Sequence, residues 1–234
     1  MYSIIDIESN GAGFRKECII DIAIFKYDGH KIVDQFISLV NPESDITPFV
    51  QKLTNISPKM VKTAPKFHEL AKRVIEITEG TTLIGHNIDF DFRMLRQSFQ
   101  RLGYDYQINT LDTIPLAKKL IPDEKSYSLQ KLVKSLGIPL VNAHRAEGDA
   151  RATLELFKLL VSKDTENEII QEQHEETNAK TYINKIKLLT QDLPSEKGFV
   201  YFQNESGKII FSDYVQDINK FSKKLFNSKL KKFE

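Results

Sequence analysis

The sequence predicts an α/β protein in which a mixed sheet packs against helices and a small α+β unit follows. Three short apolar segments with tight links open the chain, and strand and helix patterns then alternate to about residue 163. The composition changes after that point. Strands first and β-α repeats afterwards indicate an antiparallel meander that continues into parallel strands, flanked by helices.

The first three predicted strands cover residues 2–7, 18–27 and 31–40. Each is mainly apolar, as expected for strands that are buried in a sheet. Asp28 and Gly29 form a turn signal between the second and third strands. Sequential strands joined in this way predict the antiparallel meander.

From residue 67 onward, apolar residues recur at helical spacing between short apolar segments. Gly80 and Gly103 end the first two of these helices. The expected order is a helix from residue 67, strand 81–85, helix 88–102, strand 108–112, and helices near 113–120, 128–136 and 145–162.

Residues 164–177 carry six acids and no lysine or arginine. The segment 164–193 is therefore expected to be an acidic linker or, equally, a solvated extension of the last helix. Residues 194–234 contain a hairpin pattern around Gly207 and a lysine-rich end. The predicted domains are 1–163, the linker 164–193 and a small C-terminal unit, 194–234.

Composition restricts the class of protein. The chain has 234 residues and a net charge of +1, so charge gives no indication of a nucleic-acid partner. It has no apolar run of the roughly 20 residues that would span a bilayer. No secretory signal is expected, because no basic stretch precedes an apolar one at its start. Cys18 is the one cysteine and is expected to be a buried thiol. A cytoplasmic protein is expected.

Asp6 and Glu8 stand two residues apart in the first strand, so their side chains project from the same face. Two close carboxylates repel each other unless a cation lies between them, and oxygen ligands suit Mg²⁺ or Mn²⁺. Such a pair is more often ordinary surface than a metal site. Its apolar flanks, Ile4, Ile5 and Ile7, favour a functional role.

Two further groups of polar residues stand at helix starts. His86, Asn87, Asp89 and Asp91 follow a buried strand, at the kind of edge where open α/β sheets bind ligands. Asn87 or Asp89 could equally cap the helix. His144 stands before the last helix and Asp149 lies within its first turns, a pattern that alone is usually structural or exposed.

Together the three groups have the order of the DEDDh exonuclease motifs, and residues 1–163 resemble this family, which includes the proofreading epsilon subunit of bacterial DNA polymerase III. The matching residues are Asp6 and Glu8 in the first motif, Asn87, Phe90 and Asp91 in the second, and His144 and Asp149 in the third. The resemblance implies a ribonuclease H-like sheet and hydrolysis of phosphodiester bonds at a nucleic-acid 3′ end, releasing nucleoside 5′-monophosphates.

The resemblance also implies roles for individual residues. The expected catalytic set is Asp6, Glu8, Asp91, His144 and Asp149, with the four carboxylates holding two divalent cations, Mg²⁺ or Mn²⁺, and His144 acting as the general base. The expected substrate-binding residues are Ile7, Ser9, Asn10, Gly11, His86 and Asn87. The family usually has Thr-Thr-Gly after its first Glu, whereas this chain has Ser9, Asn10 and Gly11. We expect Asn10 to alter the grip on the terminal nucleotide.

The expected partner is single-stranded or 3′-end nucleic acid, DNA rather than RNA, with association with a DNA polymerase as a further possibility. Three alternatives stay open: an RNA-trimming enzyme of the same fold, a catalytically silent nucleic-acid-binding module, and an unrelated metal phosphohydrolase acting on nucleotides.

The C-terminal unit resembles a different family, the GIY-YIG nuclease domains, through residues 198–201 and 207–211. The match then fails, because Asp213 takes the place of the expected second Gly and Phe221 falls near the expected catalytic Arg. The unit is expected to be an inactive remnant or an unrelated hairpin with a helix.

Overall fold

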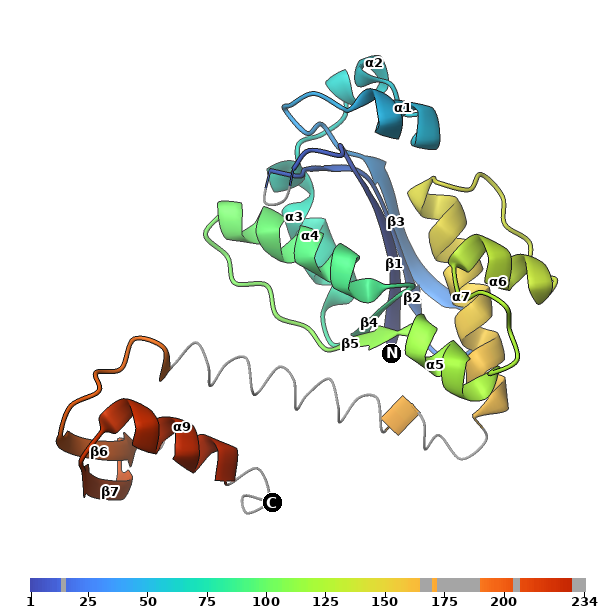
Figure 1. Cartoon of the computed structure of the whole chain (residues 1–234). Coiled ribbons are helices and arrows are strands. Elements are labelled where there is room, and N and C mark those ends of the chain that lie inside the picture. Colours follow the sequence, from blue (N-terminus) through green and yellow to red (C-terminus); the bar gives the residue numbers. More distant parts are fainter. Residues whose placement is uncertain (14–15, 165–169, 172–189, 204–206, 229–234) are drawn as a thin grey trace. The chain divides into compact units, whose positions relative to one another are not determined.

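The computed structural model describes residues 1–13, 16–164, 170–171, 190–203 and 207–228. The chain divides into two compact units, Met1–Glu175 and Glu176–Glu234, which are described separately (Figure 1).

The first unit is built on a five-stranded mixed sheet with the order β3-β2-β1-β4-β5. Its strands are β1 (Tyr2–Ser9), β2 (Ile19–Tyr27), β3 (Ile32–Leu39), β4 (Thr82–Gly85) and β5 (Thr110–Asp112). The pairs β1–β2 and β2–β3 are antiparallel, whereas β1–β4 and β4–β5 are parallel. The predicted meander continued by parallel strands is therefore confirmed.

Helices cover both faces of this sheet (Figure 1). They are α3 (Phe67–Thr78), α4 (Ile88–Arg101), α5 (Thr113–Leu120), α6 (Leu129–Ser135) and α7 (Ala146–Lys163). Ile5 and Ile7 of β1 pack in the apolar cluster that contains residues of α3 and α4. Ile4 packs in the cluster that contains residues of α5, α6 and α7. Because side chains alternate along a strand, Asp6 and Glu8 lie on the same face as Ile4, towards α7.

Two short helices, α1 (Pro48–Thr54) and α2 (Pro58–Lys62), are not predicted by apolar periodicity. Each begins with a proline after a side-chain cap, in which the hydroxyl of Thr47 or Ser57 accepts a hydrogen bond from the helix backbone. These two helices are too short to show a repeat, so only their capping residues could have predicted them.

The expectation of a buried Cys18 thiol was wrong. β2 begins one residue later, at Ile19, and Cys18 is only half-buried. Its Sγ lies 3.3 Å from Nη1 of Arg101 on α4.

The second unit contains the antiparallel hairpin of β6 (Gly198–Gln203) and β7 (Ile209–Val215), followed by α9 (Ile218–Ser228). The rings of Phe211 and Phe221 stack at 6.1 Å between the hairpin and this helix. The predicted hairpin with a helix is therefore present.

The predicted acidic linker lies largely outside the described residues. Ile170 is described, and it is 5% exposed within the apolar cluster that contains residues of α5, α6 and α7. This residue of the first unit lies beyond the predicted domain end at residue 163, so the position of that boundary stays a prediction.

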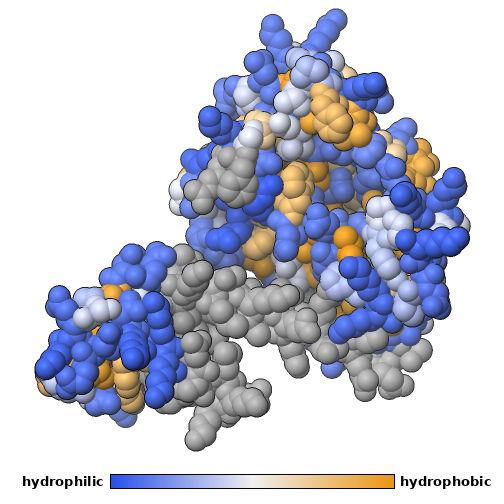
Figure 2. All heavy atoms as spheres, in the orientation of Figure 1, coloured by the Kyte–Doolittle hydropathy of each residue, from blue (hydrophilic) through white to orange (hydrophobic). Residues whose placement is uncertain are grey.

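The face of the first unit that Figure 2 shows is mostly polar, with some apolar side chains among the polar ones. Among the described residues of this unit, Phe49 and Val141 are the most exposed large apolar side chains, at 72% and 67%. Among the described helices, none has the length and apolar character that crossing a membrane requires.

Candidate active site

Three carboxylates meet above β1. The strand presents Asp6 and Glu8 towards α7, and Asp149 lies in the first turn of that helix. One ligand oxygen from each of these residues lies within 4.8 Å of the other two. They line an open cavity of about 370 Å³. The remaining lining residues are Ile7, His86, Asn87, Phe90, Asp91, Ser128, Leu129, Gln130 and His144.

Asp91 enters the same cavity from α4 and is 4% exposed. Burial raises the pKa of its carboxyl well above the usual value, and the nearby backbone N–H of Ile7 partly offsets this rise. The structure thus brings the four predicted carboxylates to one cavity, three of them close together and the fourth beside them.

Burial and mutual repulsion disfavour the charged forms of these carboxylates. Burial raises the pKa of Asp6 well above its usual value, and the charges of Asp91, Asp149 and Glu8 add to the effect. Burial and the charge of Asp149 raise the pKa of Glu8 to about 7. A divalent cation would remove this penalty, so the donor set and its electrostatics fit a metal site.

His144 lies in the turn before α7 with a φ of 63°, a left-handed conformation that is uncommon outside glycine. Its backbone N–H donates to the Asp149 carboxylate. Its Nε2 lies 2.8 Å from the side-chain amide nitrogen of Gln130 on α6. Sequence reasoning missed Gln130, because nothing local marks a polar residue on a short helix as a neighbour of a residue 14 positions away.

His86 faces the cavity, but both of its ring nitrogens have partners inside the protein. Nε2 lies 2.7 Å from the carbonyl oxygen of Tyr127, and Nδ1 lies 2.8 Å from the Thr113 hydroxyl. Burial lowers the pKa of the imidazole, which favours its neutral form. In that form Nε2–H donates to the carbonyl and Nδ1 accepts from the hydroxyl. These contacts favour a structural role over the predicted substrate contact through a ring nitrogen.

Asn10 is completely buried, and its side-chain amide is used inside the protein. It donates to Ser44 Oγ and to the Asp45 carbonyl, and it accepts from the backbone N–H groups of Ala12 and Cys18. These bonds commit the side chain to holding the loop after β1, and the expected influence of Asn10 on the grip on the terminal nucleotide stays a prediction.

The other predicted substrate-binding residues differ in their positions. Ile7 and Asn87 line the cavity. Asn87 is left-handed, with a φ of 72°, and its backbone N–H donates to Asp112 Oδ1. Ser9 and Gly11 lie at and beyond the end of β1 and do not line this cavity. A Cβ added at Gly11 would lie 2.5 Å from Thr47 Oγ1, so α1 packs tightly on this loop.

An ion pair between a buried aspartate and a half-buried arginine, next to the site, was also not anticipated. Asp21 of β2 is the register partner of Glu8, and its Oδ2 accepts a hydrogen bond of 2.7 Å from Nε of Arg145. The available signal was one acid inside an otherwise apolar segment, and such an acid requires a partner when it is buried.

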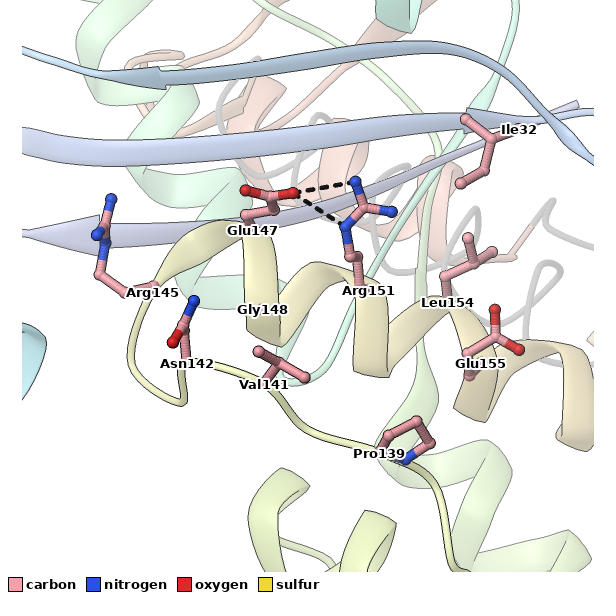
Figure 3. Close-up of a pocket in the computed structure, with 10 residues that line it drawn as sticks. All are labelled: Ile32, Pro139, Val141, Asn142, Arg145, Glu147, Gly148, Arg151, Leu154 and Glu155. Atoms are coloured by element: carbon pink, nitrogen blue, oxygen red, sulfur yellow. Dashed lines mark hydrogen bonds and ion pairs between the residues drawn. The ribbon is translucent and has the colours of Figure 1, made fainter.

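A larger cavity of about 560 Å³ lies elsewhere on the first unit (Figure 3). It contains none of the four carboxylates and not His144. In it Glu147 pairs with Arg151, one turn further along α7.

A family model with the description exonuclease, of the RNase T type, matches residues 3–157, which is more than half of the chain. The chain belongs to the RNase T exonuclease family. The matched range contains all four carboxylates and His144.

Curated relatives of this chain carry related segments within much longer proteins. The chain is 36% identical over 162 residues to a PolC-type DNA polymerase III from Caldanaerobacter subterraneus, covering 69% of this chain and 12% of that protein. It is 37% identical over 153 residues to the 3′-5′ exonuclease DinG of Staphylococcus haemolyticus, covering 65% of this chain and 17% of that one. The chain therefore spans less than a fifth of either relative.

Solved structures of exonucleases share the fold. Exonuclease X in complex with 5′ overhanging duplex DNA is 28% identical, with a TM-score of 0.56 over 70% of this chain and 93% of that one. Escherichia coli ExoI in a single-stranded DNA complex is 22% identical, with a TM-score of 0.64 over 88% of this chain and 48% of that one. The second likeness concerns the fold alone.

Proposed function

We propose that this exonuclease removes nucleoside 5′-monophosphates from the 3′ end of DNA in a metal-dependent reaction. The observation that carries the proposal is the convergence of Asp6, Glu8, Asp91, Asp149 and His144 on one open cavity. The names of the DinG relatives support the 3′-5′ polarity.

Asp6, Glu8, Asp91 and Asp149 would hold two divalent cations, Mg²⁺ or Mn²⁺, because buried carboxylates that repel one another supply the oxygen ligands these ions prefer. When bound, the cations stabilise the negative charge that develops on the phosphate oxygens.

His144 acts as the general base in this proposal. Its neutral imidazole accepts a proton from the attacking water, whose oxygen forms the new bond to phosphorus. The bond between phosphorus and the 3′ oxygen of the preceding nucleotide breaks, and that oxygen keeps the bonding electron pair and takes a proton from solvent. The phosphate leaves with the terminal nucleoside. Ile7, Asn87 and Phe90 line the cavity and would position that nucleotide.

DNA is the proposed polymer, because exonuclease X, which is 28% identical, was solved in complex with duplex DNA and one relative is a DNA polymerase. We further propose that the protein associates with a DNA polymerase. We also propose a cytoplasmic location, which suits the free thiol of Cys18. An RNA-trimming role is the competing outcome of the test.

The test is digestion of end-labelled single-stranded DNA, duplex DNA and RNA with Mg²⁺ or Mn²⁺. A 5′-labelled DNA strand should shorten as a ladder, and a blocked 3′ end should resist. Cuts in a circular single strand, full activity in EDTA, or hydrolysis of free nucleotides but not oligonucleotides would each refute the proposal. Faster digestion of RNA would change the substrate, and tight binding without turnover would indicate a silent module.

A further inference from the structure

The ion pair between Asp21 and Arg145 joins the sheet to the turn that carries His144. Asp21 is 1% exposed, whereas the Arg145 side chain is 35% exposed. Oδ2 of Asp21 accepts from Nε of Arg145 at 2.7 Å and from the backbone N–H of Ala146 at 3.3 Å. One carboxylate oxygen thus holds both the side chain and the backbone at the start of α7.

The two ends of this link are neighbours of the catalytic groups. Asp21 stands opposite Glu8 in the β1–β2 register, and Arg145 follows His144 directly in the chain. Figure 3 shows Arg145 at the beginning of α7 with its guanidinium directed towards the neighbouring strands. This pair therefore forms a polar connection between the sheet and the turn that carries His144.

The turn needs such a hold because its backbone is strained. His144 and Asn142 are both left-handed, with φ of 63° and 55°. Conformations of this kind persist at functional sites only where the surroundings impose them. In addition, Arg145 caps α7 without a side-chain hydrogen bond to the helix, so its side chain serves the contact with Asp21 instead.

We propose that Asp21 and Arg145 are positioning residues that fix His144 over the carboxylate cluster. The proposal rests on the exonuclease function proposed above and assigns the pair no contact with the substrate. A merely structural pair would stabilise the fold without affecting the proton-transfer step. A positioning pair acts on turnover through His144, because a displacement of about 1 Å in a catalytic group can reduce a rate about 100-fold.

The first experiment compares Asp21→Asn and Arg145→Lys with the parent chain. Single-turnover hydrolysis at saturating oligonucleotide and metal should fall about 10- to 100-fold. Oligonucleotide affinity should stay near that of the parent in both variants, and Mn²⁺ affinity should stay near it in Arg145→Lys, which keeps the charge. In Asp21→Asn, which removes a charge beside Glu8, Mn²⁺ affinity should fall much less than the rate. Matched controls come from the other described Arg–Asp pair between a helix and the sheet, Arg73 with Asp34. Asp34→Asn and Arg73→Lys should leave the rate unchanged.

The second experiment is a double-mutant cycle with His144→Ala. If the pair acts through His144, Arg145→Lys should cost little further rate once His144 is absent. Melting temperatures identify variants that fail to fold. If Asp21→Asn does not fold, Arg145→Lys, which keeps the positive charge, still tests the proposal.

Three results would overturn the proposal: unchanged rates in both variants, a fall in metal affinity that parallels the rate, or losses that multiply in the cycle. An inactive parent chain would instead refute the exonuclease function.

Discussion

At the scale of single residues, Asp149 illustrates a conflict between stability and function. It lies 7% exposed beside Asp6 and Glu8, and its burial raises the pKa of its carboxyl. Asp149→Asn should abolish hydrolysis and weaken Mn²⁺ binding, yet raise the melting temperature of the metal-free chain at pH 8, because one repelling charge is removed. Asp89→Asn, an exposed acid on α4, is the control and should change none of these. A lower melting temperature for Asp149→Asn would contradict the repulsion.

Replacing each of the two histidines of the cavity should affect a different property, the rate for His144 and the stability for His86. His144→Gln should reduce the single-turnover rate about 10²- to 10⁴-fold, the usual range for a lost general base, at nearly constant melting temperature. His86→Gln should lower the stability by about 1–3 kcal/mol, because it leaves the buried partners of the ring unpaired, and should reduce the rate much less. Both quantities are measured on the same samples. A near-normal rate in stable His144→Gln would remove this residue from the mechanism.

The sequence reveals the residues whose chemistry is marked locally and misses those defined by distant partners. Asp6 and Glu8 are recognisable because two acids share one face of an apolar strand. Asn10 is not, since its bonds to Ser44 and Asp45 cross more than 30 positions. Asp21 has its partner 124 positions away. Such roles follow from tertiary packing, which no local pattern contains.

At the scale of elements, α7 packs unusually close to the segment before it. A Cβ added at Gly148 would lie 2.0 Å from the Val141 carbonyl oxygen. Gly148→Ala gains about 1 kcal/mol of helix propensity, but overpacking typically costs about 1–3 kcal/mol. We expect a lower melting temperature and a slower reaction, because His144 lies between these two residues. Gly13→Ala, which meets no atom within 4 Å, should leave stability unchanged. An active, more stable Gly148→Ala would show that the contact relaxes freely.

Elements of the sheet and the longer helices follow from periodicity, but their boundaries do not. β1 extends to Ser9, beyond the apolar run, because pairing with β2 continues past Glu8 with a register shift. β5 contains only three residues, Thr110–Asp112, because its pairing with β4 covers only these positions. Backbone pairing therefore determines where these strands end, whereas the side-chain pattern determines that a strand or helix forms there.

At the scale of the whole molecule, proton and metal binding should be linked to stability. The folded-state pKa of Glu8 is raised from 4.5 to about 7, and those of Asp6, Asp91 and Asp149 are also raised. The folded metal-free chain therefore binds more protons than the unfolded one across this window. The contribution of Glu8 is fully present below pH 4.5 and is lost as the pH rises to about 7.

The melting temperature of the metal-free chain should accordingly fall between pH 4.5 and about 7, and the increase produced by Mg²⁺ should grow over the same interval. The contribution of Asp34 to stability changes with pH in the opposite direction. Its pairing with Arg73 lowers its pKa from 3.8, so this contribution is lost only as the pH falls below that value. Melting curves with and without Mg²⁺ at several pH values test the linkage. A Mg²⁺ effect that does not depend on pH would contradict it.

The boundary of the catalytic unit can be tested through Ile170. Its side chain shares an apolar cluster with Leu160 of α7 and Leu116 of α5, and its backbone N–H donates to Asp164 Oδ2 at 2.9 Å. Ile170→Ala should destabilise the first unit by about 2–5 kcal/mol, the usual cost of truncating a buried isoleucine. Ile209→Ala is the matched control, because Ile209 is 54% exposed in the second unit.

A fragment of residues 1–175 should then melt close to the parent chain and keep Mg²⁺-dependent hydrolysis, whereas a fragment of residues 1–163 should melt lower because it lacks Ile170. Detectable activity is still expected from the shorter fragment, since it contains all four carboxylates and His144. Equal melting temperatures for the two fragments would place the boundary at 163 and deny Ile170 a role in the core. A folded but inert 1–175 fragment would show that residues beyond 175 contribute to the active unit.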